Sequence, residues 1–495
     1  MTKPSASKSA NVRAHIGHPI IDCDGHMIEF EPDVLDYLRQ VGGPGVVDGY
    51  VSSIAGSRLF SWDHLSPEER LDTRVARSPW WGAPTKNTLD RATATLPRLL
   101  YERLDEFGMD FTVLFPSVGM SATYPKDEEL RRAVCRAYNT YYADLYREYS
   151  DRITAAAVIP MHKPQEAIEE LEHAVNVLGM KVVFMQAYVR RPIPAAIREM
   201  PQASRWAFWL DTYGLDSEYD YDPVWAKCVE LKVAPCFHTG ATGWGSRNSI
   251  SAYVYNHIGS FATAGEAVCK SLFLGGVTRR FPNLKFAFLE CGVGWACSLY
   301  ADLIGHWEKR NVSALENTNP ANLDRKLLFD LYKQYGGSMG ARLDQLGRDP
   351  LALGAGAAVR DEAKQTEPTP DEWAYCNIQK AEDIRDLFVN SFYFGCEADD
   401  PINAWSFNSK VNPFGARLNA IFGSDISHWD VPDMARVVEE AWELVDKELI
   451  TETDFRDFVF GNPVSLFAGT NADFFKGTLV EADVEKVIGR AASIN

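Results

Sequence analysis

The stretch Pro19-Ile20-Ile21-Asp22-Cys23-Asp24-Gly25-His26 decides how the chain is interpreted, because a short apolar strand ends there in metal-competent side chains. Residues at positions i and i+2 of an extended chain point to the same side. Asp24 and His26 can therefore face one metal ion together, and Asp22 joins them if the strand stays regular. Imidazole and carboxylate together suit a divalent zinc, manganese or iron ion.

Seven more short apolar segments follow, most of them separated from the next by a helical pattern. Continuous apolar runs of this kind are typical of parallel strands that are covered on both faces. Eight alternations predict an α/β protein with a closed (β/α)8 barrel, or TIM barrel, and no GxGxxG motif indicates a dinucleotide fold. The predicted strands cover residues 19–24, 111–115, 153–158, 181–185, 233–237, 284–289, 391–395 and 420–424.

Polar residues gather at the carboxyl ends of these strands, where barrel enzymes place their active sites. His238 follows the fifth strand, Glu290 the sixth and Asp425 the eighth. Taken singly, a histidine after a strand is more often a hydrogen-bonded structural residue, and an aspartate more often a helix cap or turn former. The joint placement of Asp24, His26, His238 and Asp425 at one end of one barrel is what favours a metal site.

Two long segments do not fit the strand–helix repeat. Residues 29–95, after the first strand, contain several Trp, Gly and Pro residues and are predicted to form an irregular lid or insertion rather than a helix. Residues 311–386, between the sixth and seventh strands, include a polar segment rich in Gly, Pro and Glu around residues 351–371. We expect a single barrel domain over residues 15–475, a disordered tail over 1–14 and a C-terminal tail over 476–495.

The composition limits the partners and the compartment. The 68 acidic and 50 basic residues give a net charge of −18, which argues against nucleic acid and anionic membranes as partners. Nine scattered cysteines without a CxxC pair are interpreted as buried free thiols in a reducing compartment. The N-terminus lacks the apolar core of a signal peptide, and no apolar run approaches the length of a transmembrane helix. We therefore expect a cytoplasmic protein.

Several motifs together resemble one known family. The Asp-x-Asp-x-His of the first strand, the histidine after the fifth, and Phe422-Gly423-Ser424-Asp425 followed by His428-Trp429-Asp430 resemble the amidohydrolase-2 group of the amidohydrolase superfamily. This group includes aminocarboxymuconate semialdehyde decarboxylase and the resorcylate-type decarboxylases. The resemblance runs from about residue 20 to about residue 475, without the two insertions. Supporting matches are Asn256-His257, Arg280-Phe281-Pro282-Asn283-Leu284, Gly292-Val293-Gly294-Trp295 and Phe460-Gly461-Asn462-Pro463.

The resemblance implies a set of metal ligands. The family usually opens with His-x-His, and no lysine stands in a bridging position after the fourth strand, which favours one ion over a carbamylated-lysine binuclear centre. We expect one divalent ion, zinc first, with manganese or iron as alternatives. A second ion, held by Glu290, His257 or Asp22, stays open. Carried over position by position, the ligands are Asp24, His26, His238 and Asp425.

Three of these residues are catalytic candidates. Asp425 is interpreted as both ligand and proton shuttle. His257 is interpreted as a general acid/base or an oxyanion contact, with a solvated histidine at a helix start as an equal alternative. Glu290 is interpreted as a partner of a ligand or as an extra ligand. Glu397, after the seventh strand, is a candidate for orienting the substrate, and His428 for pairing with a ligand.

The leading functional hypothesis is a metal-dependent amidohydrolase-fold enzyme that acts on a small carboxylated substrate by hydrolysis or non-oxidative decarboxylation. One alternative is a dinuclear iron or manganese oxygenase (hydroxylase) of the same fold. Another is a non-catalytic homologous subunit of a heteromeric enzyme. The aromatic-rich stretch Trp206–Tyr221 is either a pocket wall, an oligomer contact or ordinary packing. By analogy with similar barrels we expect a homo-oligomer, with a hetero-oligomer as the alternative.

Overall fold

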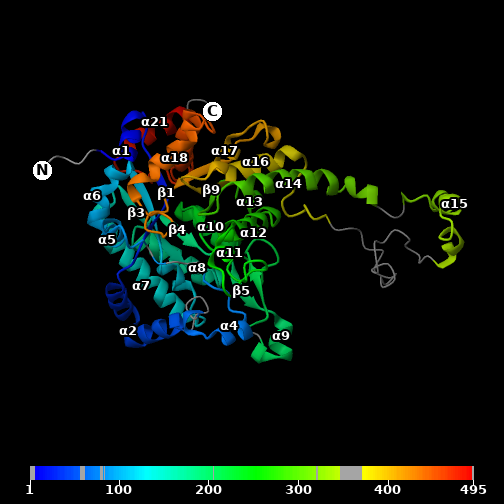
Figure 1. Ribbon diagram of the computed structural model, residues 1–495, viewed down its shortest axis with the longest axis horizontal. Coiled ribbons are helices and arrows are strands. Elements are labelled where there is room, and N and C mark those ends of the chain that lie inside the picture. The colour runs from blue at the N-terminus through cyan, green and yellow to red at the C-terminus, as the bar shows by residue number, and fades with distance from the viewer. Residues whose placement is uncertain are drawn as a thin grey trace.

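Eight parallel strands form one sheet in the computed structural model, which describes residues 6–55, 62–78, 82, 84–203, 206–318, 322–345 and 371–492 (Figure 1). The strand order is β1-β2-β3-β4-β7-β8-β9-β10, and each strand pairs in parallel with the next. The predicted barrel is confirmed, with all eight strands at the predicted places. Their bounds are β1 Ile21–Met27, β2 Phe111–Pro116, β3 Ile153–Ile159, β4 Val182–Met185, β7 Pro235–Phe237, β8 Phe286–Phe288, β9 Phe392–Glu397 and β10 Asn419–Gly423.

Backbone hydrogen bonds join the first strand to the residues after the last one. The His26 N–H donates to the Ile426 carbonyl at 3.0 Å, and the Asp425 N–H donates to the Asp24 carbonyl at 2.9 Å. The two segments approach so closely that a Cβ on Gly423 would lie 2.9 Å from the Cβ of Asp24. Only glycine fits there, because real Cβ atoms essentially never come that near. Two candidate ligands therefore lie side by side on the seam that closes the barrel.

Large aromatic side chains pack between the strands and the helices outside them, where Phe394 also stacks on Phe388 of the helix Ala381–Ser391 at 5.9 Å. Phe237 stacks on Phe288 with ring centroids 5.7 Å apart, and Phe288 stacks on Phe394 at 5.9 Å. All three are buried, and such aromatic pairs add about 0.5–1.5 kcal/mol to the area that they bury. The nine cysteines are also buried and unpaired, which confirms that they are free thiols in the core.

Helices cover the outside of the barrel (Figure 1). Local capping signals set their ends: Asp127 accepts a hydrogen bond from the Leu130 N–H at the start of α7, and Gly108 ends α6 in a left-handed conformation with φ 75°. The longer covering helices bury apolar side chains, such as Leu104 of α6 and Val134 of α7. The covering helices are α6 Pro97–Phe107, α7 Glu128–Tyr146, α8 Pro164–Glu172, α10 Asp222–Leu231, α12 Ser260–Leu274, α13 Val277–Arg280, α14 Gly294–Arg310, α16 Ala381–Ser391, α18 Val437–Asp446, α19 Glu452–Arg456 and α20 Asn462–Phe467.

The segment between β1 and β2 is largely helical, so the prediction of an irregular stretch there was wrong. It contains α2 Glu31–Ala55, α4 Pro67–Thr73 and α5 Thr88–Thr93. The glycines and proline that argued against a helix are concentrated at a kink inside α2, where Gly43 has φ 72° and Pro44 follows it. Val34 and Leu38 are buried on the apolar side of α2. Trp80 and Trp81, which supported the irregular interpretation, lie outside the described residues.

Both predicted tails also contain helices. In the N-terminal tail, α1 Lys8–His15 is capped by the Ser7 hydroxyl, and Arg13 pairs with Asp110 beside β2. The C-terminal tail contains α21 Glu481–Ala492. Neither helix shows a strong signal in the sequence, because α1 is short and polar and its stabilising partners are far along the chain. The prediction of a disordered tail over residues 1–14 was therefore wrong for residues 8–14, which belong to α1.

A hairpin that the sequence did not predict lies between β4 and α10. Its strands are β5 Val189–Pro192 and β6 Phe208–Asp211, which pair antiparallel. The aromatic stretch Trp206–Tyr221 includes this second strand. Tyr213 and Tyr221 are buried and stack edge to face at 4.9 Å, whereas Trp206 is 43% exposed. Ordinary packing therefore accounts for the buried part of this stretch.

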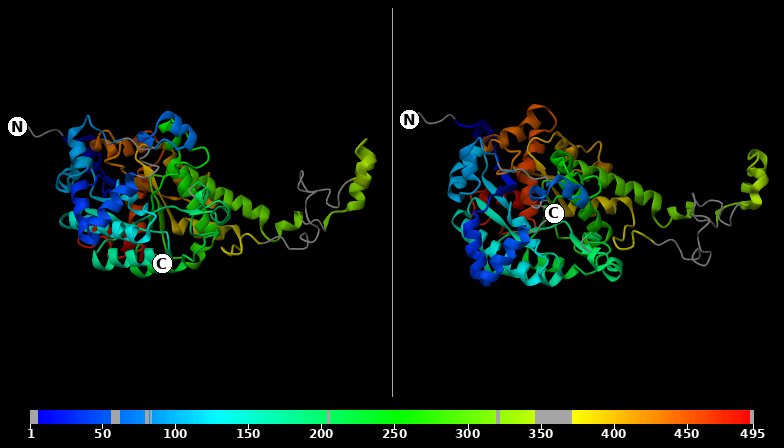
Figure 2. Two further views of the ribbon diagram at one scale, coloured as in Figure 1. Left: turned by 90° about the horizontal axis from the view of Figure 1, so that it is seen from below. Right: turned by 60° about the horizontal axis from the view of Figure 1, so that its bottom comes forward.

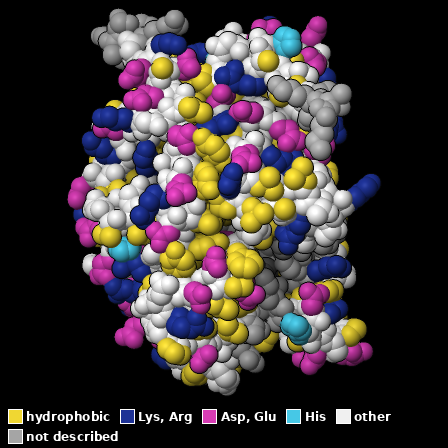
Figure 3. Space-filling model, turned by 90° about the vertical axis from the view of Figure 1, so that its left-hand side faces the viewer, with side chains coloured by type: hydrophobic (Ala, Val, Ile, Leu, Met, Phe, Trp, Pro, Cys, Tyr) yellow, Lys and Arg dark blue, Asp and Glu magenta, His cyan; other side chains and the backbone are white. Residues whose placement is uncertain are grey.

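An arm extends from the barrel, formed by the end of α14 and by α15 Arg325–Tyr335, and the views of Figure 2 agree on it. None of the described α15 side chains is buried. The segment around residues 351–371 lies outside the described residues except for Asp371. On the face shown in Figure 3, side chains of both charges are interspersed around a band of hydrophobic ones. Among the described helices, none is long and apolar enough to cross a lipid bilayer.

Candidate metal centre

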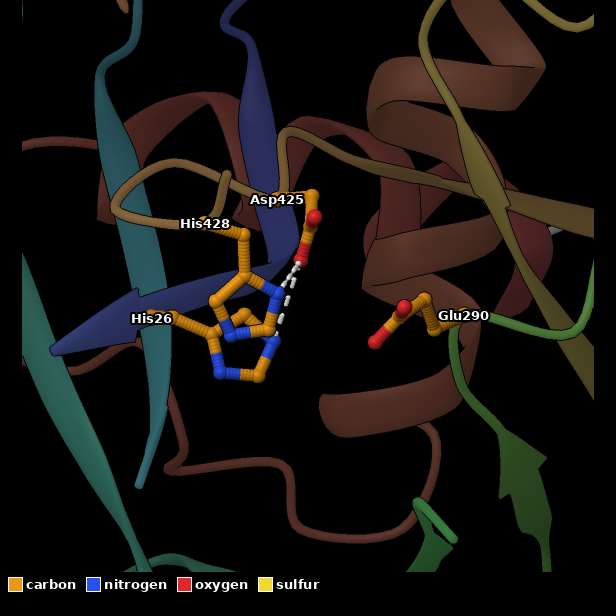
Figure 4. Close-up of side chains that lie close together, drawn as sticks. All are labelled: His26, Glu290, Asp425 and His428. Carbon is orange, nitrogen blue, oxygen red and sulfur yellow. Dashed lines mark ion pairs between the residues drawn. The ribbon is translucent and has the colours of Figure 1, made fainter. Parts of the chain in front are cut away.

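Five of the predicted site residues meet at one end of the barrel. Asp24 and His26 lie on β1, and His238 directly follows β7. Glu290 and Asp425 each come two residues after the end of a strand, β8 and β10 respectively. Parallel strands bring their carboxyl ends to the same rim, and this is why residues up to 401 positions apart become neighbours. Figure 4 shows His26, Asp425 and Glu290 from three different strands facing a common space.

Asp24, His26 and His238 form a first group of potential ligands. Their donor atoms lie within 4.8 Å of one another, and all three side chains are buried. Asp24 Oδ1 lies 3.6 Å from His26 Nε2 and also 3.6 Å from His238 Nε2. The two imidazole rings meet edge to face at 4.9 Å. Such spacing suits three atoms that each approach one ion at about 2.0–2.2 Å.

His26, Glu290, Asp425 and His428 form a second group that shares His26 with the first. Asp425 Oδ1 lies 3.3 Å from His26 Nε2 and 2.6 Å from His428 Nδ1 (Figure 4). Glu290 Oε2 lies 3.2 Å from the Nε2 of His238, which belongs to the first group. The His428 ring stacks on the His26 ring at 3.6 Å. All five predicted residues are therefore close together, and His428 lies among them.

Several atoms that face this space have no hydrogen-bond partner among the described residues. Buried polar atoms are almost always paired, because an unpaired one costs about 1–3 kcal/mol. A cluster of such atoms from residues that metals prefer fits a cation better than an ordinary polar network does. The atoms are Asp24 Oδ1, His26 Nε2, His238 Nε2, Glu290 Oε2 and both carboxylate oxygens of Asp425, although Asp425 Oδ1 also forms the close contacts given above.

The electrostatics of the site favour a bound cation. Burial, followed by the charges of Glu290 and Asp22, raises the pKa of Asp24 to about 8 although His238 opposes this. Burial raises the pKa of Glu290 and of Asp425 well above the ordinary values, with the neighbouring Asp430 adding to both. Burial also lowers the pKa of His26 well below its ordinary value. The imidazoles are therefore neutral, and the carboxylates repel one another when they are ionised. A divalent ion binds neutral imidazoles and offsets this repulsion between carboxylates.

Two of the acidic residues have an unusual backbone. Glu290 has φ 53° and Asp425 has φ 49°, in the left-handed region that non-glycine residues rarely adopt. Such a conformation costs about 1–3 kcal/mol and persists where the surroundings enforce it, often at functional sites. In Asp425 the hydrogen bond from its N–H to Asp24 helps to enforce it. The turn after each strand thereby aims a carboxylate back into the barrel mouth (Figure 4).

Asp22, which the sequence left open as a ligand, belongs to neither group of potential ligands, and both of its carboxylate oxygens accept hydrogen bonds. Its Oδ2 accepts hydrogen bonds from Thr112 Oγ1 at 2.6 Å and Ser424 Oγ at 2.8 Å. Its Oδ1 accepts from the Ser424 and Asp24 N–H groups at 2.9 and 3.2 Å. A bulge separates Asp22 from Gly25 in the pairing of β1 with β2, so the i, i+2 rule fails there. Asp22 instead ties β1 to β2 and to the residue after β10.

Replacing Asp22 by Ala is expected to lower the free energy of unfolding by about 3 kcal/mol or more. Two buried backbone N–H groups and two hydroxyls would lose their acceptor, and each unsatisfied buried donor costs about 1–3 kcal/mol. Urea denaturation followed by circular dichroism measures the loss. Asp22→Asn keeps one oxygen for the N–H groups and should lose clearly less. Equal stability of the Ala variant and the native protein would show that this residue does not hold the seam.

His257, Glu397 and Asp430 lie around the cluster. His257 ends α11 (Tyr253–His257), where its ring stacks on Tyr253 at 5.3 Å and meets the Trp429 ring at 5.4 Å. It is half-buried and belongs to neither potential ligand group. Glu397 ends β9 with its side chain accessible to water, and the charges of Glu290 and Asp430 act on it. Acidic groups therefore extend outward from the centre.

His428 and Asp430 have larger roles at the site than expected from the sequence. His428 was expected to pair with a ligand, and it does so, but the structure also includes it in the second potential ligand group. Asp430 acts electrostatically on Glu290 and Asp425 and was noted only as part of a motif. The spacing Asp425-x-x-His428-x-Asp430 could have indicated these roles. A tight turn after a strand brings residues at such a spacing back to the same rim of the barrel.

A parallel barrel with histidine and carboxylate side chains converging at its carboxyl end defines a class of metal-site α/β-barrel enzymes. Within this class the chain belongs to the amidohydrolase family, whose sequence model Amidohydro_2 matches residues 21–318. The match begins at β1 and includes the loops that carry His238 and Glu290. Family membership supports the expectation of a metal-dependent hydrolase or carboxy-lyase, and it confirms the resemblance seen in the sequence.

Solved structures with a similar fold cover most of the chain. An amidohydrolase from Mycobacterium avium subsp. paratuberculosis K-10 is 16% identical, with a TM-score of 0.52, over 91% of this chain and 98% of that chain. A dihydroxybenzoic acid decarboxylase from Polaromonas sp. JS666, with bound manganese and 2-nitroresorcinol, is 13% identical with a TM-score of 0.49, over 93% and 99%. A 5-carboxyvanillate decarboxylase from Sphingomonas paucimobilis is 12% identical with a TM-score of 0.48, over 91% and 98%. The first of these supports the shared barrel fold.

Proposed function

We propose that this protein is a metal-dependent enzyme that acts on a small carboxylated substrate by hydrolysis or non-oxidative decarboxylation. The observation that carries the proposal is the convergence of Asp24, His26 and His238 with buried, unpartnered donor atoms. These three side chains, with Asp425, would hold one divalent ion. The mixed nitrogen and oxygen donors suit zinc first, with manganese and iron as alternatives.

The ion would supply a Lewis acid that polarises a substrate oxygen atom or lowers the pKa of a water molecule. The protein's own groups would then move protons. Asp425 is suited to this role, because its Oδ1 lies 2.6 Å from His428 Nδ1 and its buried position raises its pKa. Glu290 faces the same space from the opposite side (Figure 4) and can hold a proton there for the same reason. His257, at the edge, is suited to contact the substrate rather than the ion.

A dinuclear iron or manganese oxygenase is the second candidate, and one observation favours it. The second group adds Glu290, Asp425 and His428 to the potential ligands of the first. Together the two groups offer more protein ligands than a single ion uses in most catalytic sites. Carboxylate-rich centres of this kind suit iron and manganese. Only this candidate requires dioxygen as a co-substrate.

Elemental analysis of protein purified without added metal tests the proposal. We expect one equivalent of zinc, manganese or iron per chain, and removal of the ion by a chelator should abolish activity that the same ion restores. Anaerobic assays with 2,6-dihydroxybenzoate and 5-carboxyvanillate, the substrates named for two similar structures, provide a first panel for release of carbon dioxide. Two equivalents of iron or manganese with oxygen-dependent turnover would favour the oxygenase. Protein that binds no divalent ion, even after incubation with each, would contradict both candidates.

A further inference from the structure

Arginines from three parts of the chain gather on the loop between His238 and α11. Arg247 lies within this loop, and its carbonyl accepts a hydrogen bond from the Gly243 N–H at 2.7 Å. Arg190 of β5 donates from Nη2 to the Thr242 carbonyl at 3.2 Å. Arg77, from the segment between β1 and β2, donates from Nη1 to the Ser251 carbonyl at 3.2 Å. The loop that starts at the metal centre thus carries three guanidinium groups.

These three guanidinium groups have no carboxylate partner among the described residues. The buried arginines elsewhere are paired: Arg131 with Glu166 and Arg191 with Asp211. The absence of a partner is notable in a chain where acidic residues exceed basic ones by 68 to 50. No Asp or Glu occurs among the undescribed residues that are near these arginines in the sequence, which are 56–61, 79–81, 83 and 204–205. Within the described part of the chain, no carboxylate therefore neutralises these three charges, although Arg77 lies over the Trp62 ring at 4.7 Å and Arg190 over the Phe208 ring at 4.9 Å.

Arg247 has the most constrained position of the three. Its Nε is buried and has no hydrogen-bond partner among the described residues. Its Nη2 packs against the backbone at Gly259, where an added Cβ would lie 2.7 Å from that nitrogen. Gly259 comes two residues after His257 and starts α12 with φ 68°. The Nη1 of Arg247 donates a long hydrogen bond of 3.5 Å to Ser246 Oγ, an uncharged acceptor. A partly desolvated guanidinium with no anionic partner among the described residues is costly, and a planar oxyanion that accepts two parallel hydrogen bonds would satisfy it.

The charge of the centre itself explains why a cationic region is needed beside it. Glu290 and Asp425 lie there with Asp24, and three carboxylates in one buried space would repel an anionic substrate. Arginine binds carboxylate and phosphate groups through its planar fork of donors. A substrate with one end at the ion and an anionic end toward this loop would have both ends matched in charge.

We propose that Arg247, assisted by Arg77 and Arg190, binds an oxyanion group of the substrate at the side of the metal centre. This proposal deepens the proposed function, since it rests on a small anionic substrate reaching that centre. It assigns to the loop the selection of negatively charged substrates over neutral ones.

Isothermal titration of the full chain with phthalate and with inorganic phosphate tests this proposal. Arg247→Gln should weaken binding of at least one of the two anions by about tenfold or more, since hydrogen bonds to charged groups are the strong ones. Arg98→Gln is the matched control, because Arg98 is an exposed arginine of α6 that pairs with Glu102. It should bind both anions as the native protein does. Arg247→Lys, which keeps the charge but loses the fork, should fall between the two.

The titrations are repeated on protein stripped of metal. Anion binding that persists there and is lost in Arg247→Gln would support the arginine site even if the metal centre had a different function. Loss restricted to phthalate would identify a carboxylate site, and loss restricted to phosphate a phosphate site. Native affinity of Arg247→Gln for both anions, or no binding of either anion by the native protein, would overturn the proposal. Circular dichroism of each variant shows that the barrel is intact.

Discussion

The His238→Ala variant is expected to lose its metal and all measurable turnover while it keeps the barrel. His238 directly follows β7, and its Nε2 lies 3.6 Å from Asp24 and 3.2 Å from Glu290, so it lies where Asp24, His26 and His238 would hold an ion. Changes to groups that merely support a ligand already cost about 10–100-fold in metal affinity. Removal of a ligand itself should cost more. Elemental analysis after gel filtration measures the bound ion directly.

The fold should survive this change, because the His238 ring lies at the rim and not in the barrel interior. It contacts Phe115 and Phe261 with centroids 5.9 and 5.4 Å away, so its loss should cost about 1–3 kcal/mol. His306→Ala is the control, since His306 is an exposed histidine on α14 far from β7 in sequence. The control should keep native metal content. A full equivalent of metal in His238→Ala would remove this histidine from the ligand set.

The Asp425→Asn variant is expected to keep most of its stability and lose turnover by about 10²–10⁴-fold, the usual contribution of a positioned proton-transfer group. Asparagine has the size of aspartate and tolerates the left-handed backbone at φ 49°. The hydrogen bond from the residue's N–H to the Asp24 carbonyl is unaffected. Only the negative charge and the proton-accepting oxygen are lost. The rate is measured at saturating metal so that weaker binding of the ion does not account for the effect.

A matched control for this variant is Asp216→Asn. Asp216 also has a left-handed backbone, with φ 58°, but it is exposed and belongs to the loop after β6. It should have native activity and native melting temperature. If Asp425→Asn turned over at the native rate, Asp425 would have no part in the chemistry.

The barrel and the rim residues could be predicted because both depend on local patterns. Short apolar runs such as Val182–Met185 separated by amphipathic helices leave few architectures other than a parallel barrel. Once the barrel is assumed, every polar residue just after a strand comes to the same rim. That reasoning placed His238, Glu290 and Asp425 together although no local feature of the sequence links them.

What could not be predicted depends on contacts between distant residues. The bulge in β1 changes the direction of Asp22 relative to Asp24, and nothing in the sequence marks it except Gly25. Helix α2 was missed because Gly43 and Pro44 form a kink that the packing of both halves tolerates. The lack of a carboxylate partner for Arg247 among the described residues appears only when the neighbouring segments are in place. Local sequence rules describe none of these features.

The seam between β1 and the residues after β10 has a consequence for how the protein matures. Asp24 and Asp425 are held together there by a backbone hydrogen bond, yet they come from opposite ends of the chain. On the ligand assignment above, a ribosome must complete nearly the whole polypeptide before the ion has a place to bind. Metal capture would then be among the last events of biogenesis, and incomplete chains released early would lack both the cation and the closed ring.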